Sequence, residues 1–535
     1  MNDLIIENAA LKAELSEVKQ QLSWLMEQVS SNRRRLFGSS SEKSVYDGVG
    51  TQMGLFDEAL GDAVTHTLPD PAEAKPVKTK PRKRGEMSSR LPANLPVESI
   101  ECALSESERE CQACETQMHV IGKEVARREL KIIPAKAIIR EYVRYAYGCR
   151  GCEKNDITVP IVKAPLPPQL IKGSMCSPET IAHIAVQKCV MGAPLYRQAE
   201  DWRRNGIPIA RQTMASWMIQ CSQDYLEPIY SELHRQLCRH NFLSSDDTSF
   251  QVLKEPGKSP QSKSSMWLYR TGCDAKHPIV LYDYQPDKKK ERPRDFLKGF
   301  SGFLTTDGNA AYHSLPDSIT VTGCFAHVRS DFVDALKCLK EDDRKGSLAL
   351  VGRDYCDKLF DIERDIKDKP FGERFLCRKK DAAPVLDEFH AWLEWLHPRV
   401  AQKSKLGKAV GYAINQWKYL TRYLLDGRIE ISNNRSERSI KPFVINRKNF
   451  LFADTVPGAR ASAVYHSLTE TAKENGLNPF EFLAHIFRTA VSAGNIHRDV
   501  DLVKSLLPEN APDTCKAILS PEDRPGTIIP KKNPA

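Results

Sequence analysis

Three acidic residues stand out because of the residues around them. Asp246 follows a short apolar run, and Asp307 follows Gly302-Phe-Leu-Thr-Thr and precedes a turn-forming glycine. Glu437 lies one helical turn after an Asn-Asn pair. Carboxylates at the ends of two neighbouring strands and on a helix can converge on hard divalent cations, and two such ions can clamp the attacking and leaving oxygens of a phosphodiester. The pattern therefore predicts a metal-dependent site formed by these three side chains.

A series of sequence blocks surrounds these acids. In chain order they are Arg35-Leu-Phe-Gly-Ser-Ser-Ser-Glu-Lys, two Cys-x-x-Cys pairs, Ser245-Asp-Asp-Thr, Gly302-Phe-Leu-Thr-Thr-Asp-Gly, Cys324-Phe-Ala-His, Asn433-Asn-Arg-Ser-Glu and Arg447-Lys-Asn-Phe-Leu-Phe. Their order and number resemble the insertion sequence 66 family of DDE transposases along nearly the whole chain. The resemblance implies an RNase H-like catalytic core, Mg²⁺ or Mn²⁺ as the catalytic ion, and strand cleavage and strand transfer at the ends of a mobile element.

The resemblance also implies the partners. They are double-stranded DNA, as element ends and as target, and two small accessory proteins of the same element. A formal net charge of +9 permits polyanion binding without demanding it.

Each acid has an ordinary structural alternative. Asp246 can close a strand, with Asp247 as a rival for the same duty, and Asp307 with its glycine is a common turn dipeptide. Glu437 can instead cap the start of a helix at Asn434. Taken singly these alternatives are favoured, whereas the three acids together in the order of the family favour catalysis and place the catalytic aspartate at Asp246.

Length and composition bound the remaining possibilities. A chain of 535 residues is too long for one core and predicts about three to four domains. No apolar run approaches the length of a membrane helix, and the polar N-terminus is unlike a signal peptide, which predicts a cytoplasmic, nucleoid-associated protein without a membrane partner. The 15 cysteines favour reduced thiols and a metal site over a disulfide framework.

Two Cys-x-x-Cys pairs predict a zinc-binding domain over residues 101–160. A segment with strand-like alternation separates the two pairs, and four thiolates can close a tetrahedral structural Zn²⁺ site. The alternative, four unrelated buried cysteines, needs two matching spacings by chance. The predicted ligands are Cys111, Cys114, Cys149 and Cys152.

The N-terminal region predicts a coiled coil followed by a linker. Leu4, Leu11, Val18 and Leu25 recur every seven residues within 1–44, which favours self-association into a homo-oligomer over a single amphipathic helix. Residues 45–100 are rich in proline and basic side chains, as in a linker. This basic stretch can follow a phosphate backbone or serve only as a solvated tether.

Residues 175–235 predict a helical region that resembles a helix-turn-helix. One helix leads to Asn205-Gly206, and a second begins near Ala210. The second helix opens with side chains that can read base edges or hold phosphates, namely Arg211, Gln212 and Thr213. An ordinary helical hairpin has the same pattern.

The fold class expected is multidomain α/β. Strand-like runs followed by helices suit an RNase H-like core, with its first part over 240–335 and its second part, with C-terminal helices, over 427–500. The separation between Asp307 and Glu437 predicts an α-helical insertion over 336–426. Phe450-Leu-Phe is expected to form a strand, and Asn478-Pro479 is expected to open a helix with proline at its first position. Residues 501–535 are expected to form a tail that is loosely ordered after Pro508.

Several basic residues near the acids are candidates for DNA contact. His327 can contact the scissile phosphate or act in proton transfer, or it can be a structural histidine, and Arg329 follows it. Residues 330 and 331 depart from the family pattern, which usually has two basic residues there. The remaining candidates, for which ion pairs to the protein's own acids are the alternative, are Arg438, Lys441, Arg447 and Lys448.

Two other functions are weighed against a transposase. A catalytically inactive DNA-binding regulator derived from a transposase would keep the N-terminal modules, but a pure binder has no need to gather three like charges. Another RNase H-like nuclease would explain the acids but not the Asn433 and Arg447 blocks. The sequence therefore favours the transposase.

Overall fold

The computed structural model describes residues 137–143, 145–147, 162–163 and 165–517. The chain divides into two compact units, and the smaller one spans Ser39–Ala164. Its described part contains a two-stranded antiparallel ribbon of β1 (Ala146–Tyr147) and β2 (Val162–Lys163). The predicted coiled coil, the predicted linker and the four predicted zinc ligands lie outside the described residues.

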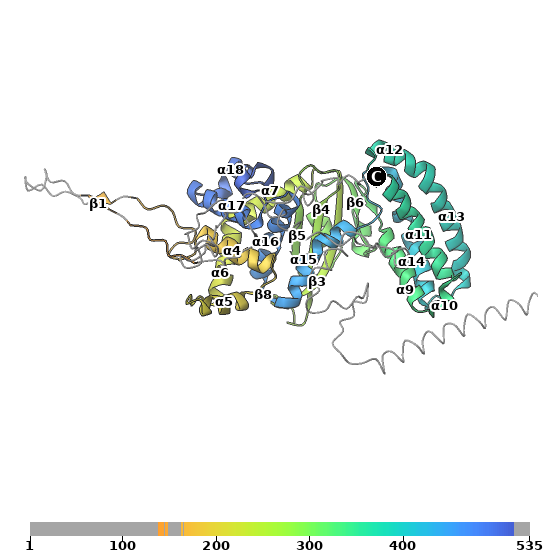
Figure 1. The fold of residues 1–535 in the computed structure, drawn as a ribbon, viewed down its shortest axis with the longest axis horizontal. Helices are drawn as coiled ribbons and strands as arrows, with labels where there is room; N and C mark the ends of the chain where they lie inside the picture. The colour runs from red at the N-terminus through yellow and green to blue at the C-terminus, as the bar shows by residue number, and fades with distance from the viewer. Residues whose placement is uncertain (1–136, 144, 148–161, 164, 518–535) are drawn as a thin grey trace, which may run out of the picture. The chain divides into compact units, whose positions relative to one another are not determined.

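A mixed sheet lies at the centre of the larger unit (Figure 1). Its strands in chain order are β3 (Phe242–Lys254), β4 (Lys263–Thr271), β5 (Val280–Gln285), β6 (Gly302–Thr305), β7 (Ile319–Thr322) and β8 (Phe452–Thr455). The strand order is β5-β4-β3-β6-β7, and β8 pairs with the far end of β3. β4 runs antiparallel to β3 and to β5, whereas β6, β7 and β8 run parallel to β3. The expected mixed α/β architecture is confirmed.

Both faces of the sheet carry buried side chains, because successive residues of a strand point to opposite sides. On β4, Trp267 and Tyr269 belong to one hydrophobic cluster, whereas Met266 and Leu268 belong to another. All four side chains are fully buried. Tyr269 stacks on Phe296 of α8 (Glu291–Phe296) with 3.9 Å between ring centroids.

Two helices from the C-terminal part pack against the sheet. α15 (Asn434–Phe450) packs its Phe443 into the cluster that contains Met266. α16 (Val456–Glu474) lies along the edge strand β5, where the Thr471 hydroxyl accepts from the Val280 N–H at 3.0 Å and donates to the Val280 carbonyl at 2.9 Å. Two residues further along β5, the N–H of Tyr282 also points toward α16 and donates to the Ser467 hydroxyl at 2.8 Å. These hydroxyls satisfy an edge that would otherwise offer unpaired backbone groups.

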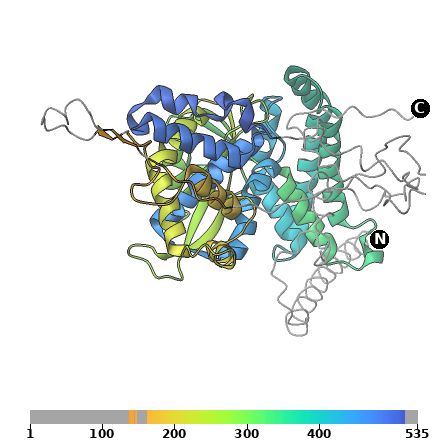
Figure 2. The ribbon, with the colours of Figure 1, turned by 60° about the vertical axis from the view of Figure 1, so that its left-hand side comes forward.

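A block of helices separates β7 from α15. It consists of α9 (Phe325–Lys337), α10 (Glu341–Arg344), α11 (Leu348–Asp365), α12 (Phe371–Cys377), α13 (Ala383–Leu396) and α14 (Lys405–Leu420). These helices form one group beside β6, and the turned view shows the same grouping (Figures 1 and 2). The apolar faces of α9, α11, α13 and α14 share a hydrophobic cluster, which includes Phe332, Phe389 and Ala413.

The N-terminal helices of the larger unit follow the predicted pattern. They are α4 (Pro178–Cys189), α5 (Leu195–Arg204), α6 (Arg211–Cys221) and α7 (Glu227–Leu237), with a π-helical turn over Ser222–Leu226 between the last two. The turn between α5 and α6 contains Gly206, whose φ of +80° suits glycine. The predicted helix, turn and helix are therefore confirmed as structure.

Two sequence expectations differ from the structure. A strand is expected over Phe450-Leu-Phe, but α15 continues to Phe450 and β8 begins only at Phe452. Phe450 lies two turns after Phe443, and the two rings pack with 6.0 Å between centroids, so the helical face extends through the apolar run.

The expected tail over 501–535 is also wrong in its first part. α17 (Pro479–Ala493) is followed by α18 (Val500–Ser505), which packs against α7. The backbone N–H of Asn478 donates to the carbonyl of Cys515 at 2.8 Å. Apolar side chains of this segment join the core, namely Val503, Leu506, Leu507 and Cys515. Within the described residues, no helix is both long and apolar enough to span a bilayer.

Candidate active site

The first two predicted acids lie on or just after adjacent parallel strands. Asp246 lies within β3, where it pairs with Leu268 of β4, so the expectation that it stands at the end of a strand is wrong, whereas Asp307 does follow the end of β6. Ser244 and Thr305 form the last pair of the ladder between β3 and β6. Two residues further along the chain lie Asp246, still within β3, and Asp307, just beyond β6, so the register at this point brings the two carboxylates near each other. The backbone N–H of Asn309 donates to Oδ1 of Asp307 at 3.1 Å, which fixes the aspartate in a local turn.

Gly308 allows a close approach beside Asp307. A Cβ at this position would lie 2.7 Å from the hydroxyl oxygen of Tyr412 on α14, which is closer than real Cβ contacts. The Asp-Gly dipeptide therefore does more than form a turn, because it lets the helical block pack against the strand end.

Asp246 and its neighbour Asp247 have different surroundings. Asp247 forms an ion pair with Lys288, accepts from the Ser265 hydroxyl at 3.1 Å and accepts from Asn309 Nδ2 at 2.9 Å. Asp246 accepts a hydrogen bond from the Asp247 N–H at 2.8 Å, and no cationic side chain pairs with it among the described residues. Asp247 is thus neutralised by the protein, whereas the charge of Asp246 remains uncompensated.

Glu437 is positioned by the start of α15. The N-cap residue Asn433 is fully buried, and its side-chain Nδ2 donates to the carbonyl of Ser245, directly before Asp246, at 2.9 Å. Its backbone N–H donates to the sulfur of Cys324 at 3.1 Å. Glu437 stands in the first turn, where the helix dipole favours a negative charge. The alternative in which Glu437 is the capping residue of a helix start at Asn434 does not fit. The N-cap residue is Asn433, which puts Glu437 one position too far along the helix for a capping box.

The three acids interact electrostatically. Burial, and then the facing carboxylates of Asp307, Glu437 and Asp247, raise the pKa of Asp246 to about 7. Burial is also the main cause that raises the pKa of Asp307. Buried carboxylates that face one another disfavour their own ionisation, so the site would gain from a bound cation.

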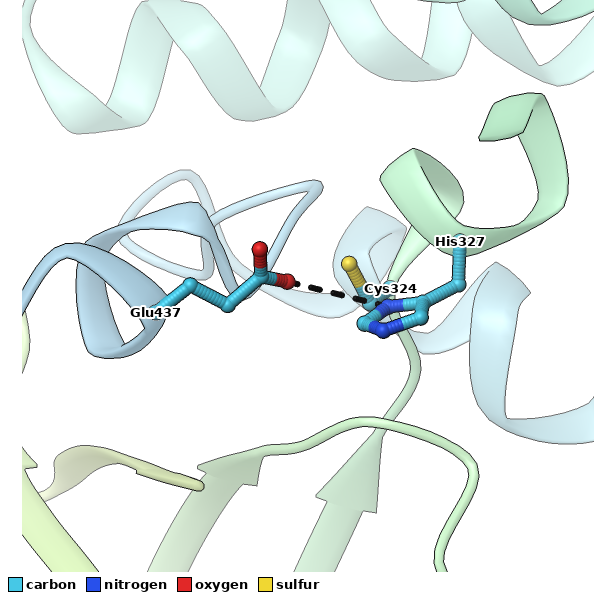
Figure 3. A group of neighbouring side chains, drawn as sticks. All are labelled: Cys324, His327 and Glu437. Atoms are coloured by element: carbon cyan, nitrogen blue, oxygen red, sulfur yellow. Dashed lines mark ion pairs between the residues drawn. The ribbon is translucent and has the colours of Figure 1, made fainter. Parts of the chain in front are cut away.

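His327 approaches the same site from α9. Its Nδ1 lies 3.8 Å from Oε1 of Glu437, and the ligand atoms of Cys324, His327 and Glu437 all lie within 4.8 Å of one another (Figure 3). The neighbouring Cys324 sulfur, and then Glu437 and Asp307, raise the pKa of His327 to about 10. The sequence pointed to His327 but not to the role of Cys324 beside it.

The three predicted acids supply the oxygen donors that a divalent cation prefers, although among the described residues the ligand atoms within 4.8 Å of one another are those of Glu437, Cys324 and His327 and do not include Asp246 and Asp307. Asp246, Asp307 and Glu437 offer carboxylate oxygens, which Mg²⁺ and Mn²⁺ bind in preference to softer donors. Burial first, and then the neighbouring carboxylates, raise the pKa of Asp246, and no cationic side chain among the described residues pairs with it. Beside Glu437, the buried Oδ1 of Asn433 and Oγ of Ser436 lack hydrogen-bond partners among the described residues.

Comparison with known proteins identifies the family. A sequence profile described as transposase IS66 family matches residues 173–461, which is more than half of the chain. The chain belongs to the IS66 transposase family. Two further profiles match its N-terminal part: a zinc-finger binding domain of transposase IS66 over 108–153, and a domain described as transposase C of IS166 homeodomain over 24–100.

Relatives of this IS66-family chain occur in Sinorhizobium fredii. The protein y4jD is 28% identical over 524 residues, which cover 94% of this chain and 98% of y4jD. The protein y4qI is 31% identical over 386 residues, which cover 68% of each chain. Among solved structures, the Drosophila P element transposase strand transfer complex aligns with 62% of this chain and 94% of that chain, at 11% identity and a TM-score of 0.23. At that score the alignment does not bear on the fold.

The candidate DNA contacts on α15 of this transposase lie mostly on one exposed face. Arg438, Lys441 and Lys448 are exposed and are spaced so that they share a side of the helix. Arg447 instead donates to the hydroxyl of Thr248 on β3 at 3.1 Å. None of the four cations has an ion-pair partner within 4.0 Å in the described part of the chain, so the alternative of internal ion pairs is not supported.

The other predicted DNA contacts lie in two places. Arg211, Gln212 and Thr213 are exposed at the start of α6, as a base-reading role would require. Arg329 forms an ion pair with Asp357 of α11, which also pairs with Arg353 at 3.2 Å. The guanidinium of Arg329 is therefore engaged within the protein.

Two asparagines that the sequence analysis did not single out connect α15 to the helix-turn-helix-like region. Asn446 Nδ2 donates to the carbonyl of Cys189 at 2.7 Å, and Asn449 Nδ2 donates to the carbonyl of Gly192 at 3.0 Å. Gly192 has φ of +70°, and a Cβ there would lie 2.7 Å from Oδ1 of Asn446. One helix thus carries Glu437 at its start and contacts the loop that leads into α5 near its end.

A buried arginine in the transposase orders the chain that leads into α15. Arg378 lies in a π-helical turn and is fully buried. It forms two hydrogen bonds of 2.7 Å to the carboxylate of Glu363. Its remaining donors bind backbone carbonyls in the connection from α14 to α15, namely those of Tyr423, Asp426 and Ile429.

We expect Arg378→Met to destabilise the folded protein by about 3–5 kcal/mol. The substitution leaves buried carbonyls and part of the Glu363 charge without a partner. Arg353→Ala is the control, because its ion pairs lie at the surface and should contribute about 1 kcal/mol or less. Urea unfolding of both variants measures the difference, and equal losses would contradict a special role for Arg378.

Proposed function

We propose that this transposase cleaves and joins DNA strands at the ends of an insertion sequence by DDE-type chemistry. The observation that carries the proposal is the approach of Asp307, which follows β6, and Glu437, at the start of α15, to Asp246 on β3, with no cationic side chain of the described residues paired with Asp246. An inactive DNA-binding regulator would have no use for that arrangement, because it raises the free energy of the folded chain.

The proposed core is RNase H-like. Three antiparallel strands followed by two strands parallel to the first, in the order β5-β4-β3-β6-β7, support this assignment. The helical block α9–α14 then interrupts the core between the strand that precedes Asp307 and the helix that carries Glu437.

Each residue of the site has a proposed role. Asp246, Asp307 and Glu437 would hold Mg²⁺ or Mn²⁺, which supplies charge stabilisation to the attacking and leaving oxygens of the phosphodiester. Asp247, paired with Lys288, keeps Asn309 in place. The raised pKa of His327 keeps its ring protonated at neutral pH, so that it can form an ion pair with Glu437 and donate to a phosphate oxygen.

DNA would lie along the cationic face of α15 and against the start of α6. Arg438, Lys441 and Lys448 can neutralise phosphates without breaking ion pairs of the protein. Arg211 and its two neighbours are placed to contact base edges or phosphates. In addition, the predicted coiled coil over 1–44 would join chains into a homo-oligomer, which synapsis of two element ends would use.

The direct test is strand cleavage and joining on DNA that flanks the gene. Purified full-length protein should cut and join this duplex with Mg²⁺ or Mn²⁺ and should be inactive without a divalent ion. An unrelated duplex of equal length and base composition is the control. Binding without any cleavage under all these conditions, with and without the element's small accessory proteins, would favour the inactive regulator.

We further propose that Cys111, Cys114, Cys149 and Cys152 bind one structural Zn²⁺, since the zinc-finger match at 108–153 contains all four. A strong chelator should release about one zinc per chain and unfold this region, because a closed thiolate site contributes directly to folding. Cys111→Ser with Cys149→Ser should abolish retention. Metal analysis of the purified protein decides, and full retention by the double variant would rule these ligands out.

A further inference from the structure

The end of α15 and the start of β8 carry a cluster of three exposed apolar side chains within eight residues of the chain. Leu451 is 65% exposed, Phe452 is 42% exposed, and Ile445 on the last turns of α15 is 58% exposed. These three side chains pack on no described cluster, unlike Phe450 directly before them. Large apolar side chains left exposed near one another commonly belong to a surface that contacts another molecule.

Leu451 also has an unusual backbone. Its φ of +61° and ψ of −52° lie in a strained region, and it is the one non-glycine residue with positive φ in the described part of the chain. Glycine would adopt this conformation more easily. The leucine therefore raises the free energy of the fold without burying its side chain, so a role in packing does not explain it.

The charges around this cluster favour a polyanion as its partner. Lys441 and Lys448 lie on the same exposed face as Ile445, and Arg438 begins that face next to Glu437. The acid closest in sequence, Asp454 on β8, is already paired with Lys254 at 2.8 Å. A surface for a second protein chain would not need an apolar tip at the end of a row of cations, whereas a DNA duplex matches both features.

We propose that Leu451 acts as a wedge that inserts between base pairs of the bound DNA and unstacks one base step. This inference rests on the proposed function, because the duplex must follow the cationic face of α15. Apolar side chains flanked by cations kink duplexes in this way, and pyrimidine–purine steps yield most easily.

The length of α15 predicts where the distortion falls. From Glu437 to Leu451 the helix advances about 21 Å, at about 1.5 Å per residue. A duplex rises about 3.4 Å per base pair, so one that runs along the helix meets Leu451 about six base pairs from the scissile phosphate.

The test uses duplexes of the element end in which 2-aminopurine replaces single bases on both sides of the cut. Full-length Asp246→Asn protein binds them, so that the DNA stays intact while fluorescence reports unstacking. We expect a rise of several-fold confined to a position about six base pairs from the cut. Adding Leu451→Ala should remove most of this rise, and Leu451→Met should retain it.

A matched control comes from the helical block. Leu376 on α12 is 64% exposed, like Leu451, but is not on the cationic face, so Leu376→Ala should leave the signal unchanged. The Leu451→Gly variant tests whether the leucine side chain acts on the DNA or stabilises the fold. It should lose the fluorescence signal while melting at or above the temperature of the parent protein, because glycine relieves the strained backbone.

Distinct outcomes would overturn the proposal. A wild-type chain that binds and cuts the duplex without any local rise, or a rise that survives Leu451→Ala, contradicts the wedge alone. A change in sedimenting mass on Leu451→Ala without DNA would show instead that the cluster joins two copies of the chain. If the wild-type chain neither binds nor cuts element-end DNA, both the wedge and the proposed function fail.

Discussion

Asp246→Asn, Asp307→Asn and Glu437→Gln should each lower strand cleavage and joining by about a thousandfold or more. The substitutions nearly preserve shape but remove the negative charge that would hold a divalent ion against the scissile phosphate, and such an ion contributes several kcal/mol to the transition state. DNA affinity should change little, because it rests on cations such as Lys441 and Lys448. Cleavage assays and binding titrations at one fixed salt concentration measure the two effects separately.

Asp247→Asn is the internal control for this series. Asp247 has the same chemistry and is adjacent in sequence, but Lys288, Ser265 and Asn309 already satisfy its carboxylate. Its loss should therefore reduce activity only mildly, through the placement of Asn309. An inactive Asp247→Asn beside an active Asp246→Asn would shift the assignment by one residue, and activity in all four variants would refute the DDE mechanism.

The sequence predicted the elements whose patterns are local. The strands of the sheet follow apolar runs bounded by turn residues, and the helix that begins after Asn478 opens with proline as expected. The end of α15 was missed because Phe450-Leu-Phe has the composition of a strand, and only the contact of Phe450 with Phe443 decides between the two structures. The packing of residues 501–517 was missed for the same reason, since it depends on contacts with α7 and α17.

The candidate site shows the same division. Spacing and resemblance pointed to Asp246, Asp307 and Glu437, and the structure places these three within electrostatic reach of one another. What holds them there could not be read from the sequence. Asn433 reaches the strand of Asp246, and Arg378 binds the connection into α15, through hydrogen bonds between residues far apart in the chain. Such side chains carry no periodic signal, because their partners are set by the tertiary fold.

The loss of folding stability caused by bringing these acids together should be measurable without any enzyme assay. Burial and the facing carboxylates raise the pKa of Asp246 to about 7, whereas the unfolded chain keeps the ordinary value near 4. Between about pH 4 and pH 7 the unfolded state releases a proton that the folded state retains, so the free energy of unfolding falls as the pH rises through this window. Above about pH 7 the loss is complete and remains.

Asp246→Asn should therefore stabilise the protein at pH 8 in buffer free of divalent ions, by about 1–3 kcal/mol. Asparagine cannot ionise, and its side-chain oxygen can still accept from the Asp247 N–H. The advantage should shrink toward pH 5, where the wild-type carboxyl is protonated in the fold. Adding Mg²⁺ should then raise the melting temperature of the wild type far more than that of the variant, because the ion binds the ionised acids of the folded state. Thermal melts over pH and Mg²⁺ concentration test both claims, and a variant that melts below the wild type at pH 8 without Mg²⁺ would show that Asp246 stabilises the fold instead of burdening it.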